Sequence, residues 1–173
     1  MTHPMTSSTI APAAPAQVDG RRRAATVAVG VLALGVLLGV LWWVAAPLAR
    51  ADVVDGQVYL TGHPELQVAQ DGWFAAVTGL TGVLAATIAS LRPSREDAVS
   101  AALGPVLGLV VAVVAWQTGG LLGPDSLASQ VAAGSSHPLT PLQLHAYGAL
   151  LVGPLLFTVT RFLATLFSAE PAS

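Results

Sequence analysis

"AATVAVGVLALGVLLGVLWWVAAPLA" (Ala24–Ala49) contains no ionisable residue. The stretch follows three consecutive arginines and ends immediately before Arg50. A helix needs about 20 predominantly apolar residues to cross a hydrocarbon core about 30 Å thick. The stretch is long enough, and it therefore predicts a transmembrane helix over about residues 24–46.

A cleaved secretory signal is the alternative interpretation of this stretch. The three arginines, the apolar run and "ARAD" (Ala49–Asp52) resemble a signal peptide that ends in an A-x-A cleavage site. The apolar core of a signal peptide spans about 7–15 residues, however, and this run is longer. Trp42 and Trp43 near its end are typical of an anchor at the membrane surface. The length and the tryptophans favour a retained membrane span.

Three further charge-poor stretches predict spans near residues 73–91, 98–117 and 142–163. Hydrophobic residues make up 54% of the 173-residue chain and charged residues only 9%. A soluble domain carries about 25% charged residues, so the composition is that of a membrane protein. We therefore expect an all-α membrane protein whose four transmembrane helices form a four-helix bundle.

The chain is expected to form one membrane domain with a tail at each end. Residues 24–167 would be the four-span domain. Residues 1–23 are rich in Pro, Ala, Ser and Thr and have no hydrophobic period, which predicts a disordered tail. Residues 168–173 would form a second, short tail.

The basic residues indicate how the spans are oriented. If the first span runs outward from the cytoplasm, six of the seven basic residues, all of them arginines, face inward: Arg21, Arg22, Arg23, Arg92, Arg95 and Arg161. Only Arg50 then faces outward, and cytoplasmic segments carry such an excess of positive charge. We expect a plasma-membrane protein with both termini cytoplasmic and outer loops near residues 47–72 and 118–141.

The chain also repeats itself at an offset of 74 residues. "TGHPELQ" (Thr61–Gln67) in the first half corresponds to "SSHPLTPLQ" (Ser135–Gln143) in the second. The matches at this offset are Arg21 with Arg95, Ala24 with Ala98, Ala28 with Ala102, Gly30 with Gly104, Trp42 with Trp116, and His63-Pro64 with His137-Pro138. Two more positions of offset align Leu66-Gln67 with Leu142-Gln143 and Gly72 with Gly148. Coincidence in a biased composition and tandem duplication both explain these matches, and duplication would give two parallel tandem helical hairpins.

Small residues at four-residue spacing let neighbouring helices approach closely in a membrane. The expected helix-packing residues are Gly35 and Gly39 in the first span, Gly82 and Ala86 in the second, and Gly104 and Gly108 in the third. The expected anchors at the membrane surface are Trp42, Trp43, Trp73 and Trp116. Gly153-Pro154 should kink the fourth span.

Both outer loops carry signals of local structure. "VVDGQVYL" places Asp55-Gly56 between two short apolar runs, which predicts a tight hairpin. "GPDSLASQVAAGSS" offers Asp125 or Ser126 as the N-cap of a short interfacial helix, with Leu127 and Val131 one turn apart.

Candidate chemistry is confined to the outer loops. The chain has no cysteine, and no predicted span has a charged residue at its centre, unlike proton relays and ion pathways. His63, His137 and His145 are the candidate metal ligands, but they lack the spacing of a ligand motif. A net charge of -2 without a basic stripe predicts no nucleic-acid partner. We expect no metal, no cofactor, no catalytic residue and no enzymatic activity.

Four motifs at the outer ends of the spans carry a resemblance to a known group of proteins. They are "LWWVAAP" (Leu41–Pro47), "AQDGWF" (Ala69–Phe74), "AWQTGGLLGP" (Ala115–Pro124) and "PLQLHAYGALLVGPL" (Pro141–Leu155). Their order and spacing resemble an uncharacterised family of small actinobacterial four-span membrane proteins, a domain of unknown function. The resemblance covers about residues 24–167 and implies a plasma-membrane location, with no activity or catalytic residue to transfer. The chain departs from the pattern at Gly153, where the family would have tryptophan before the proline.

These observations predict a non-enzymatic accessory or scaffold subunit that acts through helix packing and its two extracytoplasmic loops. Its partners would be the lipid bilayer and either another membrane protein or further copies of the chain. One alternative is a small homo-oligomeric transporter or channel component. A second alternative is a metal or small-ligand binder on the outer face that uses His63 and His137 as a symmetric pair.

Overall fold

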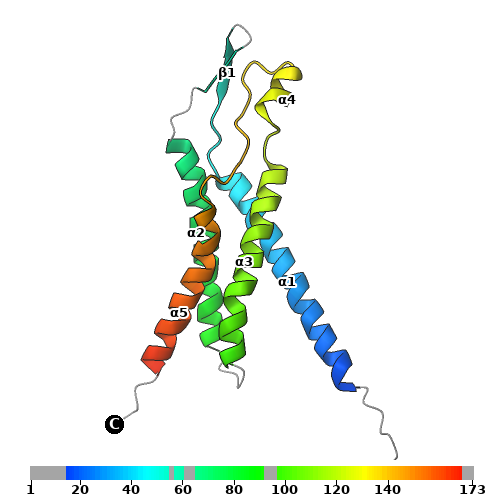
Figure 1. Ribbon diagram of the computed structural model, residues 1–173, viewed down its shortest axis with the longest axis vertical. Helices are drawn as coiled ribbons and strands as arrows, with labels where there is room; N and C mark the ends of the chain where they lie inside the picture. Colours follow the sequence, from blue (N-terminus) through cyan, green and yellow to red (C-terminus); the bar gives the residue numbers. More distant parts are fainter. Residues whose placement is uncertain (1–14, 55–56, 61–64, 92–96, 169–173) are drawn as a thin grey trace, which may run out of the picture. The chain divides into compact units, whose positions relative to one another are not determined.

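The computed structural model describes residues 15–54, 57–60, 65–91 and 97–168, and it is mostly helical (Figure 1). Its elements in chain order are α1 (Pro15–Ala45), β1 (Ala51–Val54), β2 (Gln57–Leu60), α2 (Glu65–Ser90), α3 (Asp97–Leu122), α4 (Leu127–Ala132), the 3-10 helix η1 (Tyr147–Leu151) and α5 (Val152–Ser168). The chain forms two compact units, Met1–Gly30 and Val31–Ser173. Within the described part of the first unit, the chain is helical from Pro15 onward.

In the part of the chain that the structure describes, four helical segments are long and apolar enough to cross a membrane, as the sequence predicted. They are Gly20–Ala45, Glu65–Ser90, Ala102–Ala132 and Tyr147–Phe167. The third segment includes a break, because α3 ends at Leu122 and α4 begins only at Leu127. Gly123 and Pro124 account for this break, since glycine commonly ends a helix and proline cannot continue one.

Two helices start earlier in the chain than the sequence indicated. α1 begins at Pro15, inside the predicted disordered tail, so residues 15–23 of that tail are helical. Proline suits the first turn of a helix, and the alanines, glutamine and arginines that follow favour helix. α2 begins at Glu65, whose carboxylate suits the positive end of the helix dipole. The remaining tail residues, 1–14 and 169–173, lie outside the described part of the chain.

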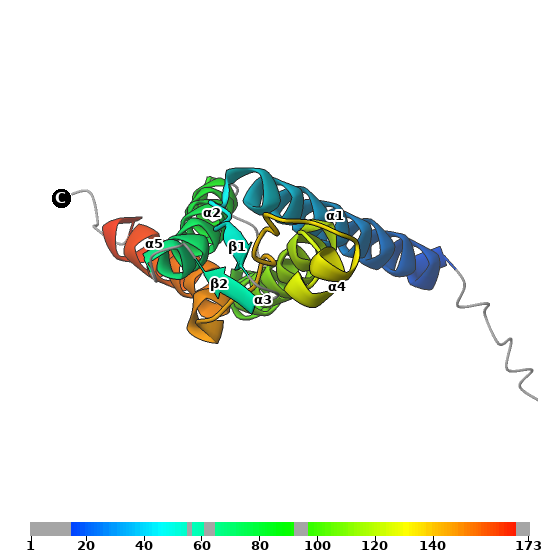
Figure 2. The same ribbon diagram turned by 90° about the horizontal axis from the view of Figure 1, so that it is seen from above.

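Helices α2 and α5 meet through glycine. A Cβ atom added at Gly82 would collide with the carbonyl oxygen of Gly153, and one added at Gly153 would lie 2.9 Å from the carbonyl oxygen of Thr78. A Cβ at Gly79 would lie 2.9 Å from the Leu156 side chain. Lipid gives helices no hydrophobic reason to pair, so this backbone approach supplies the packing contacts that hold α2 and α5 side by side (Figure 2).

The other predicted packing residues are distributed over two more contacts of the second unit. On α1, Cβ atoms at Gly35 and Gly39 would lie 2.6 Å from Val114 Cβ and 2.6 Å from the Ala115 carbonyl oxygen, both on α3. On α3, a Cβ at Gly104 would collide with the ring of Phe157 on α5, and Gly108 faces Pro154 at ordinary contact distance. Ala86 on α2 is fully buried.

The fourth span begins with a change of helix type. Tyr147–Leu151 forms the 3-10 turn η1, and the α-helical hydrogen bonding of α5 starts at Val152. Gly153 and Pro154 therefore lie in the first turn of α5, where the missing N–H of proline costs no hydrogen bond. The structure shows a 3-10 to α transition immediately before Gly153-Pro154, and the kink expected there stays a prediction.

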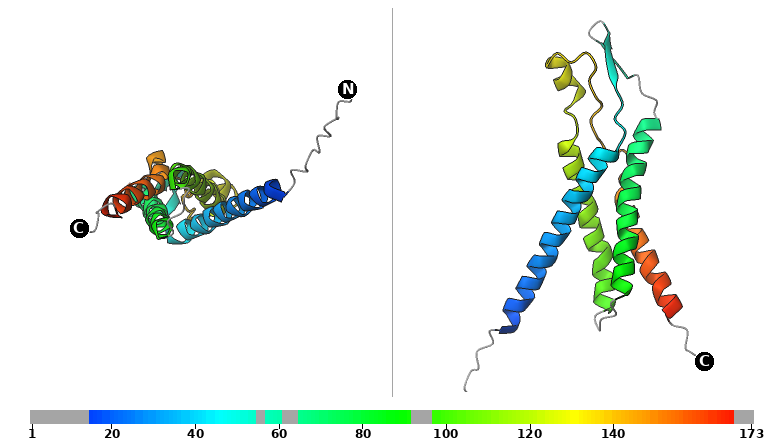
Figure 3. Two further views of the ribbon diagram at one scale, coloured as in Figure 1. Left: turned by 90° about the horizontal axis from the view of Figure 1, so that it is seen from below. Right: turned by 180° about the vertical axis from the view of Figure 1, so that it is seen from behind.

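The β-hairpin and α4 lie beyond the same end of α2 and α3, which we call the loop end (Figures 1 and 3). β1 and β2 are antiparallel, with Val54 opposite Gln57, so the predicted hairpin is confirmed. Its turn residues, Asp55 and Gly56, lie outside the described part. The predicted short helix is also confirmed: Ser126 is the N-cap of α4, and its hydroxyl accepts a hydrogen bond of 3.3 Å from the Ser129 backbone N–H.

Candidate functional site

A buried cluster joins the helices at the loop end. Trp42 on α1 and Phe74 on α2 are fully buried and meet edge to face, with ring centroids 5.0 Å apart. The Trp42 indole N–H donates to the Gln70 carbonyl oxygen at 2.9 Å. The expectation that Trp42 anchors the protein at the membrane surface is therefore wrong, because the protein interior buries both its ring and its polar atom.

The other three predicted anchors have partly accessible rings. Trp43 is 38% exposed and Trp73 is 49% exposed, so both keep surface available to a surrounding membrane. Trp116 on α3 is half-buried and belongs to a second aromatic pair, in which it meets Tyr147 edge to face at 5.7 Å.

The loop between Ala45 and β1 is tied to α2 by Gln70. Gln70 is 2% exposed, and its Nε2 donates to the Pro47 carbonyl oxygen at 3.0 Å. Its Oε1 is buried and accepts no hydrogen bond from any described residue. Burying an oxygen without a hydrogen bond lowers the stability of the fold. The hydrogen bonds made by the Gln70 backbone carbonyl and by its amide nitrogen offset this cost and fix the side chain in place.

Asp71 holds the start of η1 against α2. Its Oδ1 accepts a hydrogen bond from the His145 backbone N–H at 3.0 Å, and its Oδ2 accepts one from the Ala146 N–H at 2.8 Å. Ala146 is the N-cap residue of η1 and has no capping side chain of its own. Asp71 therefore caps the fourth span from another helix, and its negative charge favours the helix N-terminus.

The two loop-end segments also pair directly with each other. Backbone hydrogen bonds run from Ala51 N to Pro138 O at 2.9 Å and from Thr140 N to Ala49 O at 2.9 Å. The Thr140 hydroxyl adds a 3.1 Å bond to Ala49. β1 therefore lies between β2 and the segment that precedes η1. We call β1, β2, α4 and residues 136–146 the loop-end layer.

The histidines do not form a metal site within the described residues. His137 Nδ1 lies 2.8 Å from Asp52 Oδ1, and His145 Nδ1 lies 3.9 Å from Asp71 Oδ1, so each imidazole faces its own carboxylate. No group of three or more potential ligands occurs in this part of the chain. His63 lies outside the described residues. The His137–Asp52 pair is largely exposed, and exposed pairs contribute at most about 1 kcal/mol to stability.

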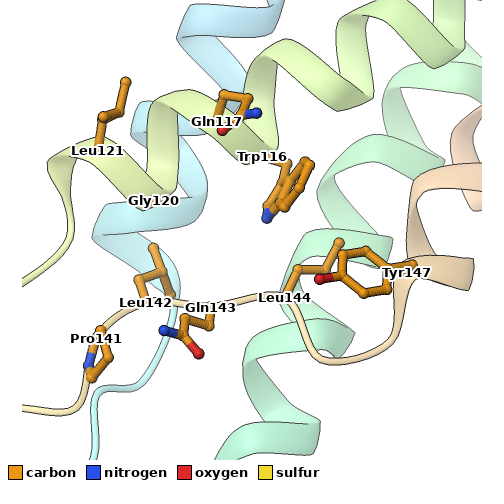
Figure 4. Close-up of a pocket in the computed structure, with 9 residues that line it drawn as sticks. All are labelled: Trp116, Gln117, Gly120, Leu121, Pro141, Leu142, Gln143, Leu144 and Tyr147. Carbon is orange, nitrogen blue, oxygen red and sulfur yellow. The ribbon is translucent and has the colours of Figure 1, made fainter. Parts of the chain in front are cut away.

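An open groove lies between the loop-end part of α3 and the extended segment before η1 (Figure 4). Its volume is about 430 Å³, within the range of small-ligand sites. The polar and aromatic side chains that line it are Trp116, Gln117, Gln143 and Tyr147. In Figure 4 the Trp116 indole nitrogen points from α3 toward the extended segment. None of the residues lining the groove is charged.

The two aromatic pairs found among the described residues have related sequences. "QDGWF" (Gln70–Phe74) supplies the partner of Trp42, and "QLHAY" (Gln143–Tyr147) supplies the partner of Trp116. Each contains glutamine four positions before the aromatic residue. The internal comparison of the two halves of the sequence, which started from the His-Pro motifs, instead matched Gln143 with Gln67. The glutamine–aromatic spacing was the available signal for Gln70, which sequence reasoning did not single out.

Comparison with known proteins adds no relative. The chain matches no family model, and no curated protein or solved structure is significantly similar to it.

Proposed function

We propose that the protein is a multi-pass plasma-membrane protein that acts by association, as a non-enzymatic accessory or scaffold subunit of a larger complex. Its loop-end layer would face outward and its two termini would face the cytoplasm. Four apolar helices support the membrane location. The excess of arginine in the segments assigned to the cytoplasm supports the orientation.

The observation that carries the proposal is that the segments at the loop end are tied to α2 and to one another. Asp71, Gln70 and Thr140 each bind backbone atoms of a segment distant in sequence. Loops held at several points present a surface of fixed shape, and a partner that binds such a surface does not have to order it first.

The polar groups inside the spans support an interior built for packing. The hydroxyls of Thr78, Thr81, Thr87 and Thr158 each donate to a carbonyl oxygen one turn earlier in their own helix. A hydroxyl bonded in this way is satisfied locally and is less available to a passing solute. This favours an associating subunit over a transport pathway.

We further propose that the chain is a tandem duplication of one helical hairpin. The Trp42–Phe74 and Trp116–Tyr147 pairs support this, since each joins an outward-running helix to the segment that returns from the loop end. Membership of the actinobacterial four-span family is likewise a proposal, and it rests on the motifs Leu41–Pro47 and Pro141–Leu155.

Affinity purification from native membranes in mild detergent, followed by mass spectrometry and native sizing, tests the association. We expect a different membrane protein to co-purify at a fixed stoichiometry. Loss of that partner from a variant with a destabilised loop-end layer would support the surface proposed for binding. Purification of the chain alone, as a monomer or a homo-oligomer, would contradict the accessory role and favour a self-assembled transporter or ligand binder.

A further inference from the structure

We propose that the groove beside Trp116 binds the uncharged glycosyl headgroup of a membrane lipid. The groove is formed by the loop-end part of α3 and by the extended segment that leads into η1 (Figure 4). The proposal goes beyond the accessory role and does not depend on it, because a lipid can bind the groove whether or not a protein partner is present.

The first argument is a comparison of the two aromatic pairs within the chain. The Trp42 N–H is bonded to the Gln70 carbonyl oxygen, and the ring is fully buried. The Trp116 N–H has no hydrogen-bond partner among the described residues, and its ring is half-buried at the edge of an open groove. One pair is thus closed by its own chain, while the corresponding donor in the other pair is left for a ligand.

The glutamines differ in the same way. Gln70 is buried, and its amide nitrogen is bonded to Pro47. Gln143 is exposed, lines the groove and has no bonded partner among the described residues, and Gln117 on α3 is exposed beside the same groove. Each glutamine amide offers two N–H donors and one acceptor oxygen, so the groove presents both kinds of polar group.

The chemistry of this lining selects the class of ligand. A sugar presents hydroxyls that both donate and accept hydrogen bonds, and amides match both roles. Its C–H faces are apolar and can lie against the rings of Trp116 and Tyr147, of which Tyr147 is 63% exposed. No charged side chain lines the groove to compensate an ionised headgroup, and an unpaired charge is costly to remove from water. An uncharged, hydroxyl-rich group fits best.

The position of the groove selects a lipid as the source of the sugar. Trp116 lies six residues before the end of α3 at Leu122, which is about 9 Å along the helix. Rings of tryptophan and tyrosine at the ends of spans lie at the level of lipid headgroups.

The test uses the purified full-length protein in phosphatidylcholine nanodiscs that contain glucosyl-diacylglycerol, with native mass spectrometry to measure the lipid retained. Trp116→Phe keeps an aromatic ring and removes the N–H, and Gln143→Ala removes the amide. We expect each to weaken retention of the glycolipid by about threefold to tenfold, the effect of one lost hydrogen bond. Trp73→Phe and Gln67→Ala are matched controls on exposed positions of α2 away from the groove, and they should retain the lipid like the unmodified chain.

Three comparisons decide the result. Retention of glucosyl-diacylglycerol above diacylglycerol and phosphatidylglycerol, with the loss confined to the groove variants, supports the proposal. The proposal would be overturned if the groove variants and the controls retained the glycolipid equally. It would also be overturned if phosphatidylglycerol were retained as strongly as the glycolipid. If soluble methyl glucoside bound as tightly as the glycolipid, the inference that the bound sugar belongs to a membrane lipid would be overturned. An unchanged elution volume of each variant separates loss of binding from loss of fold.

Discussion

Gly82→Ala is expected to destabilise the folded bundle by roughly 2–3 kcal/mol, the cost of overfilling a closely packed contact. The added methyl group would collide with the Gly153 carbonyl oxygen, which is backbone and cannot turn away as a side chain could. Relief requires α2 and α5 to separate, and that separation also removes the contact between Gly153 and the Thr78 carbonyl oxygen. A lowered midpoint of unfolding in detergent, followed by circular dichroism, is the measurement.

The matched control is Gly72→Ala in the same helix. No atom outside the helix lies within 4 Å of a Cβ at Gly72, so the new methyl group has free space. Alanine favours helix over glycine by about 1 kcal/mol, so this variant should be as stable as the unmodified chain or more stable. If both variants unfold at the same midpoint, α2 and α5 are not held by close contact at Gly82.

Asp71→Ala is expected to release the start of the fourth span from α2. The substitution removes two hydrogen bonds from a carboxylate that is only 13% exposed, and bonds to a charged group contribute roughly 1.5–3 kcal/mol each. His145 and Ala146 are exposed, so water can replace part of this loss. We therefore expect a destabilisation of about 2–3 kcal/mol, together with faster hydrogen exchange in η1, where the freed segment opens.

Asp71→Asn and Gln67→Ala distinguish the loss of the Asp71 hydrogen bonds to the start of η1 from a general effect on α2. Asparagine keeps one acceptor oxygen and loses the charge, so it should show an intermediate loss of stability and an intermediate exchange rate. Gln67 lies one turn earlier and is exposed, so its replacement should change neither quantity. If hydrogen exchange in η1 were unchanged in Asp71→Ala, the claim that Asp71 holds the start of η1 against α2 would be contradicted.

The spans were predictable because charge-free length alone identifies a membrane helix, but their ends were not. The second span was expected to start near residue 73, after the polar residues Gln70 and Asp71. These side chains bond to backbone atoms of other segments, so they are compatible with a helix that begins at Glu65. Likewise Gly119 was expected in a loop, but it lies within α3. Its lack of a side chain makes room for the ring of Trp42, with which an added Cβ atom would collide.

The local structure of the loops could be predicted, whereas the candidate site could not. The hairpin and the Ser126 cap depend on neighbouring residues, and their signals lie within a few positions in the sequence. The groove depends on which of two similar tryptophans the fold buries. Trp42 and Trp116 match at the 74-residue offset, and they differ only in their tertiary surroundings: the Trp42 N–H bonds to the Gln70 carbonyl oxygen, whereas Trp116 lines the groove.

The orientation of the loop-end layer is the premise on which the proposed surface depends, and single-cysteine labelling tests it most directly. The chain contains no cysteine, so Ala128→Cys on α4 and Ser94→Cys between α2 and α3 each introduce a unique thiol. With a membrane-impermeant maleimide on intact cells, we expect Ala128→Cys to be labelled and Ser94→Cys to be labelled only after lysis. Labelling of Ser94→Cys on intact cells, with Ala128→Cys protected until lysis, would contradict an outward-facing loop-end layer.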